Sequence, residues 1–126
     1  AISFEEGRAA ASALLCAHPE TDGIVCVNDL LAVGALDAVR GSGRRVPDDV
    51  QIIGYDDQPL MDVIGLSTVH QPMERFGSWA ADALRRLLAA PATQPASISL
   101  PLTLVARATT RPQPDRGRHS PPRLHR

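Results

Sequence analysis

Ile-Val-Cys-Val-Asn-Asp at residues 24–29 and Val-Gln-Ile-Ile-Gly-Tyr-Asp-Asp at residues 50–57 are the two stretches that decide the fold. The first opens with an apolar run that has no polar alternation, which is typical of strands covered on both faces in a parallel sheet. A helix is predicted between them over residues 30–40. Asn28 and Asp29 can cap its start, and Gly41 and Gly43 end it because glycine tolerates the left-handed backbone found at helix ends. This strand–helix–strand order favours a right-handed parallel crossover and therefore an α/β fold.

A helix is also predicted before this unit. Ser-Phe-Glu-Glu at residues 3–6 is a capping box, in which the serine hydroxyl and the second glutamate carboxylate satisfy the first free amides of a helix. The helix should end at His18, because a proline disfavours helical geometry in the residue before it. Its apolar positions at helical spacing are Ala10, Ala13, Leu14 and Ala17.

Three further elements are predicted after the unit. Beyond an irregular connection at residues 58–65, residues 66–71 form a short crossing strand. Residues 73–88 carry one apolar stripe, which predicts an amphipathic helix. Apolar residues alternate from 98 to 104 and predict a last strand, and Pro101 places it at a sheet edge because proline cannot donate a ladder hydrogen bond.

The composition excludes several classes of protein. Of the 126 residues, 44% are hydrophobic and 21% are charged, and no apolar run is long enough for a membrane helix. All 13 basic residues are arginine, which excludes lysine-dependent chemistry such as a phosphate-binding loop or a pyridoxal Schiff base. No signal peptide is visible at the N-terminus, so a cytoplasmic protein is expected.

The charge is distributed unevenly along the chain. Residues 1–111 hold nine arginines against thirteen acids, a net charge of −4, and residues 112–126 hold four arginines against one aspartate, a net charge of +3. The acidic body has no electrostatic footprint for nucleic acid, so any DNA-binding part is expected elsewhere. The arginine- and proline-rich segment 112–126 is predicted to be disordered.

The two cysteines have no paired spacing. Cys16 and Cys26 each stand on an apolar segment, and this arrangement predicts buried free thiols in a reducing compartment. Neither a disulfide framework nor a metal site is predicted.

Polar side chains follow both predicted strands at the point where each strand ends. Because parallel strands joined by a crossover end at the same sheet edge, Asn28 and Asp29 are expected to meet Asp56 and Asp57 there. Carboxylates that accept from neighbouring hydroxyls, with an amide that both donates and accepts, suit a sugar or a similar polyol. Simpler roles remain open, with Asp29 as a helix cap and Asp57 as a turn residue.

Carboxylates at a sheet edge also occur in divalent-metal and aspartyl-phosphate sites. The absence of lysine counts against a phosphoacceptor, and no Gly-x-Ser-x-Gly nucleophile elbow is present. His70 is expected beside the crevice, where a lone histidine favours a packing or surface role. We therefore predict no catalytic residues, no metal, no cofactor and no enzyme activity.

Six segments then stand in a recognisable order: Ser-Phe-Glu-Glu-Gly-Arg-Ala-Ala at 3–10, Val-Asn-Asp-Leu-Leu-Ala-Val-Gly-Ala-Leu at 27–36, Arg-Val-Pro-Asp-Asp-Val at 45–50, Ile-Ile-Gly-Tyr-Asp-Asp at 52–57, Leu-Ser-Thr-Val-His-Gln-Pro at 66–72 and Val-Ala-Arg-Ala-Thr-Thr-Arg-Pro at 105–112. Together they resemble the effector-binding core of the lactose- and galactose-repressor family of bacterial transcription regulators. The resemblance covers residues 3–112.

The resemblance implies a fold like that of periplasmic sugar-binding proteins, with two α/β subdomains joined by three crossing segments around a ligand cleft. By this likeness residues 1–69 belong to the C-terminal subdomain, residues 70–105 supply a helix and a strand of the N-terminal subdomain, and residues 106–111 cross back before the 112–126 tail. The family's helix-turn-helix, its hinge helix and most of the N-terminal subdomain are expected to be absent. The chain is thus predicted to be incomplete relative to the two-subdomain fold.

The family's polar ligand contacts fall on Asn28 and Asp56, and Gln71 lies at the crossing. The position two beyond that glutamine often carries an apolar wall of the ligand site, and Met73 occupies it here. The family's dimer face includes the helix after Asn-Asp, which makes Val33 and Leu36 candidates, with core packing as the alternative.

The implied function is effector binding and dimerisation within a transcriptional regulator. The expected partners are a small metabolite such as a sugar, a second copy of the chain and, only through a helix-turn-helix outside residues 1–126, operator DNA. No membrane partner is expected. Two alternatives stay open: a solute-binding protein of a transport system, and an inactive truncated fragment.

Overall fold

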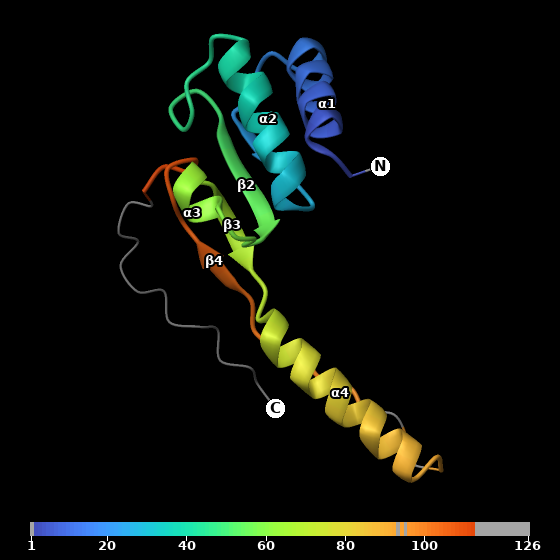
Figure 1. Ribbon diagram of the computed structural model, residues 1–126. Helices are drawn as coiled ribbons and strands as arrows, with labels where there is room; N and C mark the ends of the chain where they lie inside the picture. The colour runs from blue at the N-terminus through green and yellow to red at the C-terminus, as the bar shows by residue number, and fades with distance from the viewer. Residues whose placement is uncertain (1, 93, 95, 113–126) are drawn as a thin grey trace, which may run out of the picture.

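The computed structural model describes residues 2–92, 94 and 96–112. Four helices and four strands follow one another in the order α1, β1, α2, β2, α3, β3, α4 and β4 (Figure 1). Their bounds are Phe4–Ala17 for α1, Gly23–Val25 for β1, Asp29–Gly41 for α2, Gln51–Asp56 for β2, Met61–Ile64 for α3, Ser67–His70 for β3, Met73–Ala89 for α4 and Thr103–Val105 for β4. The part of the predicted disordered tail from residue 113 onward lies outside the described residues.

The strands form one sheet in the order β1-β2-β3-β4. β1 pairs parallel with β2, and β2 pairs parallel with β3, which confirms the predicted crossover and the α/β fold class. β4 pairs antiparallel with β3 at the sheet edge, with His70 opposite Thr103. The predicted edge strand is therefore present but shorter than the alternation suggested, because pairing begins only at Thr103.

The core lies where α2 packs on β2. Its largest fully buried side chains include Val39, Val50, Ile52 and Leu66, and Leu15 of α1 and Met61 of α3 belong to the same cluster. α3 lies in the stretch predicted to be irregular, where four residues form one helical turn closed by Gly65 at φ 76°.

α1 and α2 lie side by side (Figure 1), and their backbones come close together at Gly7 and Gly34. The residues of α1 that are buried are Gly7, Ala11 and Leu15. The predicted apolar stripe at Ala10, Ala13, Leu14 and Ala17 was wrong, since these residues are exposed. α1 is rich in alanine on every side, so hydrophobic periodicity could not mark the face that packs against α2.

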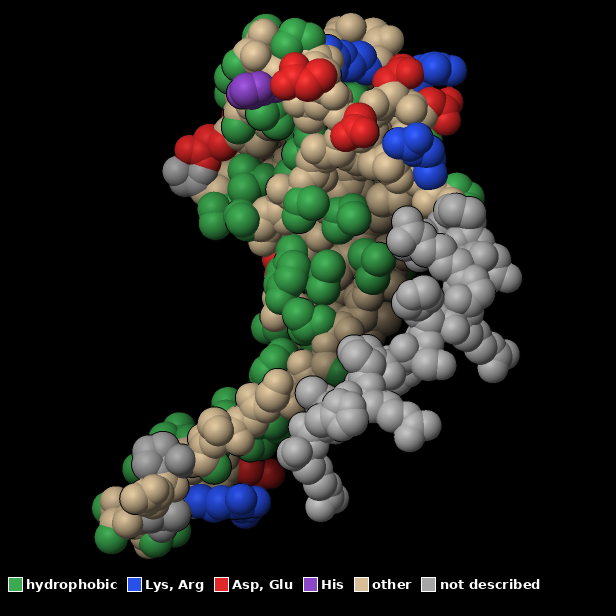
Figure 2. All heavy atoms as spheres, turned by 180° about the vertical axis from the view of Figure 1, so that it is seen from behind, with side chains coloured by type: hydrophobic (Ala, Val, Ile, Leu, Met, Phe, Trp, Pro, Cys, Tyr) green, Lys and Arg blue, Asp and Glu red, His purple; other side chains and the backbone are tan. Residues whose placement is uncertain are grey.

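The strand β1 is covered on one face only. Ile24 and Cys26 pack against the core, whereas Val25 and Val27 are 81% and 74% exposed. The expectation of a strand covered on both faces was therefore wrong for the described residues. Seen from behind, hydrophobic side chains gather on the middle of the body and continue along the arm that α4 forms (Figure 2).

The helix α4 extends away from the body (Figure 1), and none of its residues is buried. Its amphipathic pattern and its bounds confirm the predicted helix, and some of its apolar side chains are exposed, as at Leu84 and Leu88. No helix within the described ranges is long and apolar enough to cross a membrane.

The cysteines depart from the prediction at one position. Both thiols are free, but Cys16 is exposed and only Cys26 is partly buried. Burial raises the pKa of the Cys26 thiol.

Candidate functional site

A hollow of about 860 Å³ opens where β2 and β3 end and α4 begins. This volume lies within the range of pockets that hold small molecules. The hollow is lined by Asp56, Asp57, Gln58, Pro59, His70, Gln71, Pro72, Met73, Glu74 and Arg75. Three of the four predicted ligand contacts, Asp56, Gln71 and Met73, therefore lie together at the predicted sheet edge.

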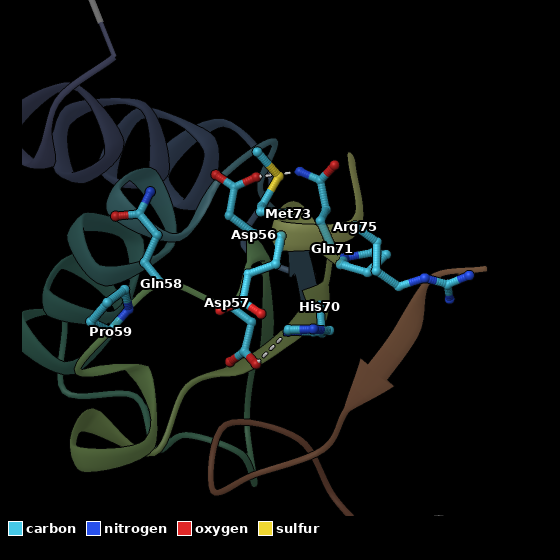
Figure 3. A pocket seen from close by; sticks show the side chains of 10 residues that line it. Asp56, Asp57, Gln58, Pro59, His70, Gln71, Met73 and Arg75 are labelled. Atoms are coloured by element: carbon cyan, nitrogen blue, oxygen red, sulfur yellow. Dashed lines mark hydrogen bonds and ion pairs between the residues drawn. The ribbon is translucent and has the colours of Figure 1, made fainter. Parts of the chain in front are cut away.

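Asp56 and Gln71 form a hydrogen-bonded pair in the wall of the hollow. The amide Nε2 of Gln71 donates to Oδ1 of Asp56 at 2.7 Å, and Met73 lies beside this pair (Figure 3). Asp56 is the last residue of β2, and Gln71 directly follows β3, so the parallel pairing of these strands brings the two side chains together. The second carboxylate oxygen of Asp56 remains available to accept from a ligand hydroxyl.

The backbone turns sharply at the two aspartates. Asp56 has φ 113° and Asp57 has φ 57°, values that non-glycine residues rarely adopt. Such conformations cost on the order of 1–3 kcal/mol each and persist only where surrounding contacts hold them. The turn makes the two side chains diverge, with Asp56 toward Gln71 and Asp57 toward His70 (Figure 3).

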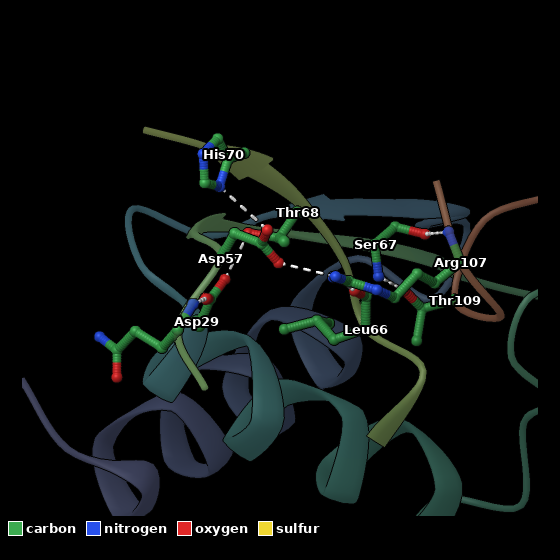
Figure 4. Close-up of polar contacts among 9 residues, drawn as sticks. Asp29, Asp57, Leu66, Ser67, Thr68, His70, Arg107 and Thr109 are labelled. Carbon is green, nitrogen blue, oxygen red and sulfur yellow. Dashed lines mark hydrogen bonds and ion pairs between the residues drawn. The ribbon is translucent and has the colours of Figure 1, made fainter. Parts of the chain in front are cut away.

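Asp57 is held by two basic side chains. Oδ1 accepts from Nη2 of Arg107 at 2.8 Å, and Oδ2 lies 3.0 Å from Nδ1 of His70 (Figure 4). Burial raises the pKa of the Asp57 carboxyl, but hydrogen bonds and charge from Arg107 and His70 outweigh it and hold that pKa below its usual range. Asp57 is therefore more than the turn residue of the simpler prediction, and His70 is more than a surface residue.

Arg107 comes from a segment that hydrogen bonds hold against the sheet. The hydroxyl of Thr109 donates to the carbonyl of Ile52 at 2.7 Å and accepts from the amide of Ser67 at 2.8 Å. The Ser67 hydroxyl in turn accepts from the amide of Arg107 at 2.8 Å. These contacts fix residues 107–109 against β2 and β3, and so they fix the place from which Arg107 reaches Asp57.

Asp29, at the start of α2, contacts the same edge of the sheet. It is fully buried, and its carboxyl oxygens accept from the hydroxyl of Thr68 and, at 2.8 Å, from the amide of Gln58 (Figure 4). A side chain at Gly54 would collide with this carboxyl group, which explains the glycine there. The alternative of Asp29 as the helix cap was wrong, because the cap of α2 is Asn28.

Asn28 does not line the hollow. Its Oδ1 accepts from the amide of Leu31 at 2.9 Å, so its side chain caps α2. Leu36 is 3% exposed in the core and Val33 packs against the same cluster, which favours the core-packing alternative for both residues. A ligand contact by Asn28 and a dimer contact by α2 stay predictions.

Sequence reasoning did not find Arg107 or Arg75 as residues of this region. The Asp57–Arg107 pair joins positions that are fifty residues apart, and no local spacing signals it. Glu74 and Arg75 lie in the first turn of α4 and line the hollow, and the apolar stripe that predicted this helix gave no sign of that.

The donor set of the hollow suits a polyol. Carboxylates accept from hydroxyls, the Gln71 amide both donates and accepts, and Met73 with Pro59 and Pro72 gives apolar surface for a ring. Within the described ranges, no group of three or more histidine, cysteine, aspartate or glutamate side chains is placed to hold a metal ion.

Comparison with protein families gives a match over nearly all of the described chain. The family described as the periplasmic binding protein-like domain matches residues 2–110. The chain is similar to the ribose operon repressor of Bacillus subtilis (strain 168), at 35% identity over 112 residues that make up 87% of this chain and 34% of that protein. It spans about a third of the length of the curated relatives it matches.

Solved structures give the same likeness. A LacI family transcriptional regulator from Arthrobacter sp. FB24, in complex with lactose, is 43% identical with a TM-score of 0.75, over 86% of this chain and 42% of that chain. A complex of the transcriptional regulator CelR with cellobiose is 33% identical with a TM-score of 0.80, over 85% of this chain and 33% of that chain.

Proposed function

Because the chain belongs to the family of periplasmic binding protein-like domains, and its relatives are LacI-family transcriptional regulators, we propose that it supplies part of the effector-binding core of such a regulator. The effector is a sugar or a similar polyol. The observation that carries this proposal is the Asp56–Gln71 pair, a carboxylate and an amide joined at 2.7 Å in the wall of a hollow at a parallel-sheet edge.

In this proposal the chain contributes one wall and the crossings of a two-subdomain cleft. Residues 1–69 form part of the C-terminal subdomain, residues 70–105 supply a helix and a strand of the N-terminal subdomain, and residues 106–111 return. The projection of α4 from the body, with none of its residues buried, supports this division. Asp56, Gln71 and Met73 contact the effector directly, and Asn28 contacts it from the start of α2.

The proposed regulator acts as a cytoplasmic homodimer rather than as an enzyme. Closure of the cleft around the effector changes the affinity for operator DNA, which a helix-turn-helix outside residues 1–126 binds. The net charge of −4 on residues 1–111 supports a DNA-binding part elsewhere, because DNA affinity rests largely on positive charge.

The test uses the complete gene product that carries this chain, with ribose, lactose and cellobiose as probes in isothermal titration calorimetry. At least one probe should bind the unaltered protein and change its affinity for DNA from upstream of its own gene. Asp56→Asn should weaken that binding by about 10- to 100-fold, since hydrogen bonds to charged groups contribute most. Asp62→Asn, an exposed aspartate of α3 outside the hollow, is the matched control and should bind as the unaltered protein does.

If Asp56→Asn leaves the affinity for a bound probe unchanged, Asp56 is not part of the effector site. If no polyol binds the unaltered protein, the proposed effector class is wrong.

A further inference from the structure

The strained turn at Asp56 and Asp57 has contacts on both sides. In the proposed function the carboxylate of Asp56 contacts the effector. Its Oδ1 also accepts a hydrogen bond from Nε2 of Gln71 at 2.7 Å. The side chain of Asp57 points toward His70 and Arg107 and is only 17% exposed, although Asp57 also lines the hollow. Non-glycine residues rarely adopt φ of 113° or 57°, and such conformations persist where surrounding contacts hold them.

Arg107 makes the shorter of the two side-chain contacts of Asp57. Its Nη2 donates to Asp57 at 2.8 Å and its Nη1 donates to the carbonyl of Leu66 at 2.9 Å. The side chain of Arg107 is itself only 19% exposed, so water screens the ion pair weakly. Arg107 thus ties the turn after β2 to the start of β3, from a segment that lies far away in the sequence (Figure 4).

We propose that Arg107 is a positioning residue for the effector site, which acts through Asp57 to hold the carboxylate of Asp56 where it meets the effector. This inference rests on the proposed function, since it concerns the same site. Arg107 itself does not line the hollow. Its role is to hold the side chain of Asp57 in place, because otherwise this largely buried carboxylate would move toward water and the turn would relax.

The positive charge on Arg107 is the property that matters in this account. A neutral side chain of similar length would leave Asp57 without its closest cation, and the free carboxylate would favour a more exposed conformation. A lysine would keep the charge, but its ammonium lacks the planar pair of donors that reaches both Asp57 and Leu66, so it should retain only part of the effect. Arg111 is the matched control: it lies on the same segment, its side chain is exposed, and only its backbone amide has a contact here, with Gln51.

The experiment measures probe affinity by isothermal titration calorimetry on the complete gene product, with whichever of ribose, lactose and cellobiose the unaltered protein binds. Each variant is measured well below its own melting temperature, so that loss of affinity reports on the folded protein. Arg107→Met should weaken binding about tenfold or more, Arg107→Lys should stay within about threefold, and Arg111→Met should match the unaltered protein. Asp57→Asn keeps the shape of the turn residue and should weaken binding as Arg107→Met does.

Binding by Arg107→Met within about twofold of the unaltered protein would overturn the positioning role while leaving the proposed function intact. An equal loss in Arg107→Lys and Arg107→Met would also overturn it, because the charge would not then be what positions Asp56. Should Arg107→Met fail to fold, Arg107→Gln takes its place and is judged by the same criterion, since Arg107 does not line the hollow whereas Asp57 does. Failure of the unaltered protein to bind any probe is a different result, which concerns the proposed function.

Discussion

The carboxyl group of Asp29 joins α2 to β3 by accepting a hydrogen bond from the hydroxyl of Thr68. Both residues are buried, and Thr68 stands opposite Gly54 in the parallel pairing of β2 with β3. The other carboxyl oxygen accepts from the amide of Gln58, directly after the turn that carries Asp56 and Asp57. One buried side chain therefore supports a helix, a strand and the loop that lines the hollow.

Removal of this contact should destabilise the fold. Thr68→Val leaves a carboxyl oxygen of Asp29 without its buried donor and should lower the free energy of unfolding by about 1–3 kcal/mol. Asp29→Ala leaves two donors unpaired and opens a cavity, so its loss should be larger, about 2–5 kcal/mol. Urea denaturation followed by circular dichroism measures both.

Asp62→Ala serves as the control for this pair of variants. Its side chain is exposed, so its effect should stay within about 0.5 kcal/mol. A Thr68→Val protein as stable as the unaltered one would show that the buried bond contributes nothing net.

The close approach of α1 and α2 gives a second prediction. A methyl group at Gly7 would lie less than 3.0 Å from backbone atoms of Leu31, and one at Gly34 would meet the backbone of Phe4 and Arg8 at similarly short range. Gly7→Ala and Gly34→Ala should therefore each lower the free energy of unfolding by about 1–3 kcal/mol, as overpacked helix contacts do. Urea denaturation measures both changes.

The control is a helical glycine with room beside it. A methyl group at Gly77 of α4 would meet no atom of a neighbouring element within 4 Å, so Gly77→Ala should raise helix stability by about 0.5–1 kcal/mol. If Gly7→Ala stabilises the protein as Gly77→Ala does, the two helices do not pack through that glycine.

The order of the elements other than α3 could be predicted from the chain because each of them is marked locally. The apolar runs before Asn28 and Asp56, the capping box at Ser3 and the stripe of residues 73–88 each give a short-range signal, and the parallel pairing follows from their order. The face of α1 that packs could not be predicted in this way. Contact there depends on the small size of Gly7 and Gly34, which hydrophobic periodicity does not register.

The residues of the site also divide into those marked by the local sequence and those that depend on long-range contacts. Asp56 was predictable because it ends a strand at an edge that the topology defines, whereas Gln71 was a candidate only through the family resemblance. The link from Asp57 to Arg107 depends on how residues 107–109 return to the sheet, which only the three-dimensional structure reveals. Long-range pairing of this kind leaves no trace in local spacing.

Asp57 should give the fold an acid-sensitive component. Its pKa in the folded protein is lowered by Arg107 and His70 against the opposing effect of burial, so its ionised form stabilises the fold. That contribution is complete above the ordinary pKa of aspartate, about 3.9, and is lost as the pH falls through the lower value of the folded state. Stability measured by urea denaturation should therefore decrease as the pH is lowered below about 4.

Asp57→Asn removes this component. The free energy of unfolding of this variant should therefore decrease less than that of the unaltered protein over the same pH interval. The carboxyl of Asp49, whose pKa the hydrogen bond from Arg45 lowers to about 2, titrates in an overlapping interval but is present in both proteins, so it cancels in the difference. Identical pH dependence of the two proteins would contradict the ion pair between Asp57 and Arg107.

Asn28 offers a way to separate a structural role from a binding role at one position. Its side chain caps α2, so Asn28→Ala should lower the free energy of unfolding by about 1 kcal/mol. Asn28→Asp keeps an oxygen that accepts from the amide of Leu31 and should stay near the stability of the unaltered protein, because a negative charge is also favourable at a helix N-terminus.

Asn28→Asp removes the amide donor, however, and if Asn28 contacts the effector this change should weaken probe binding by about fivefold or more. Calorimetry and urea denaturation on the same two variants measure the two effects separately. Unchanged probe affinity in Asn28→Asp would assign Asn28 to the helix cap alone and leave the effector contacts of this wall to Asp56, Gln71 and Met73.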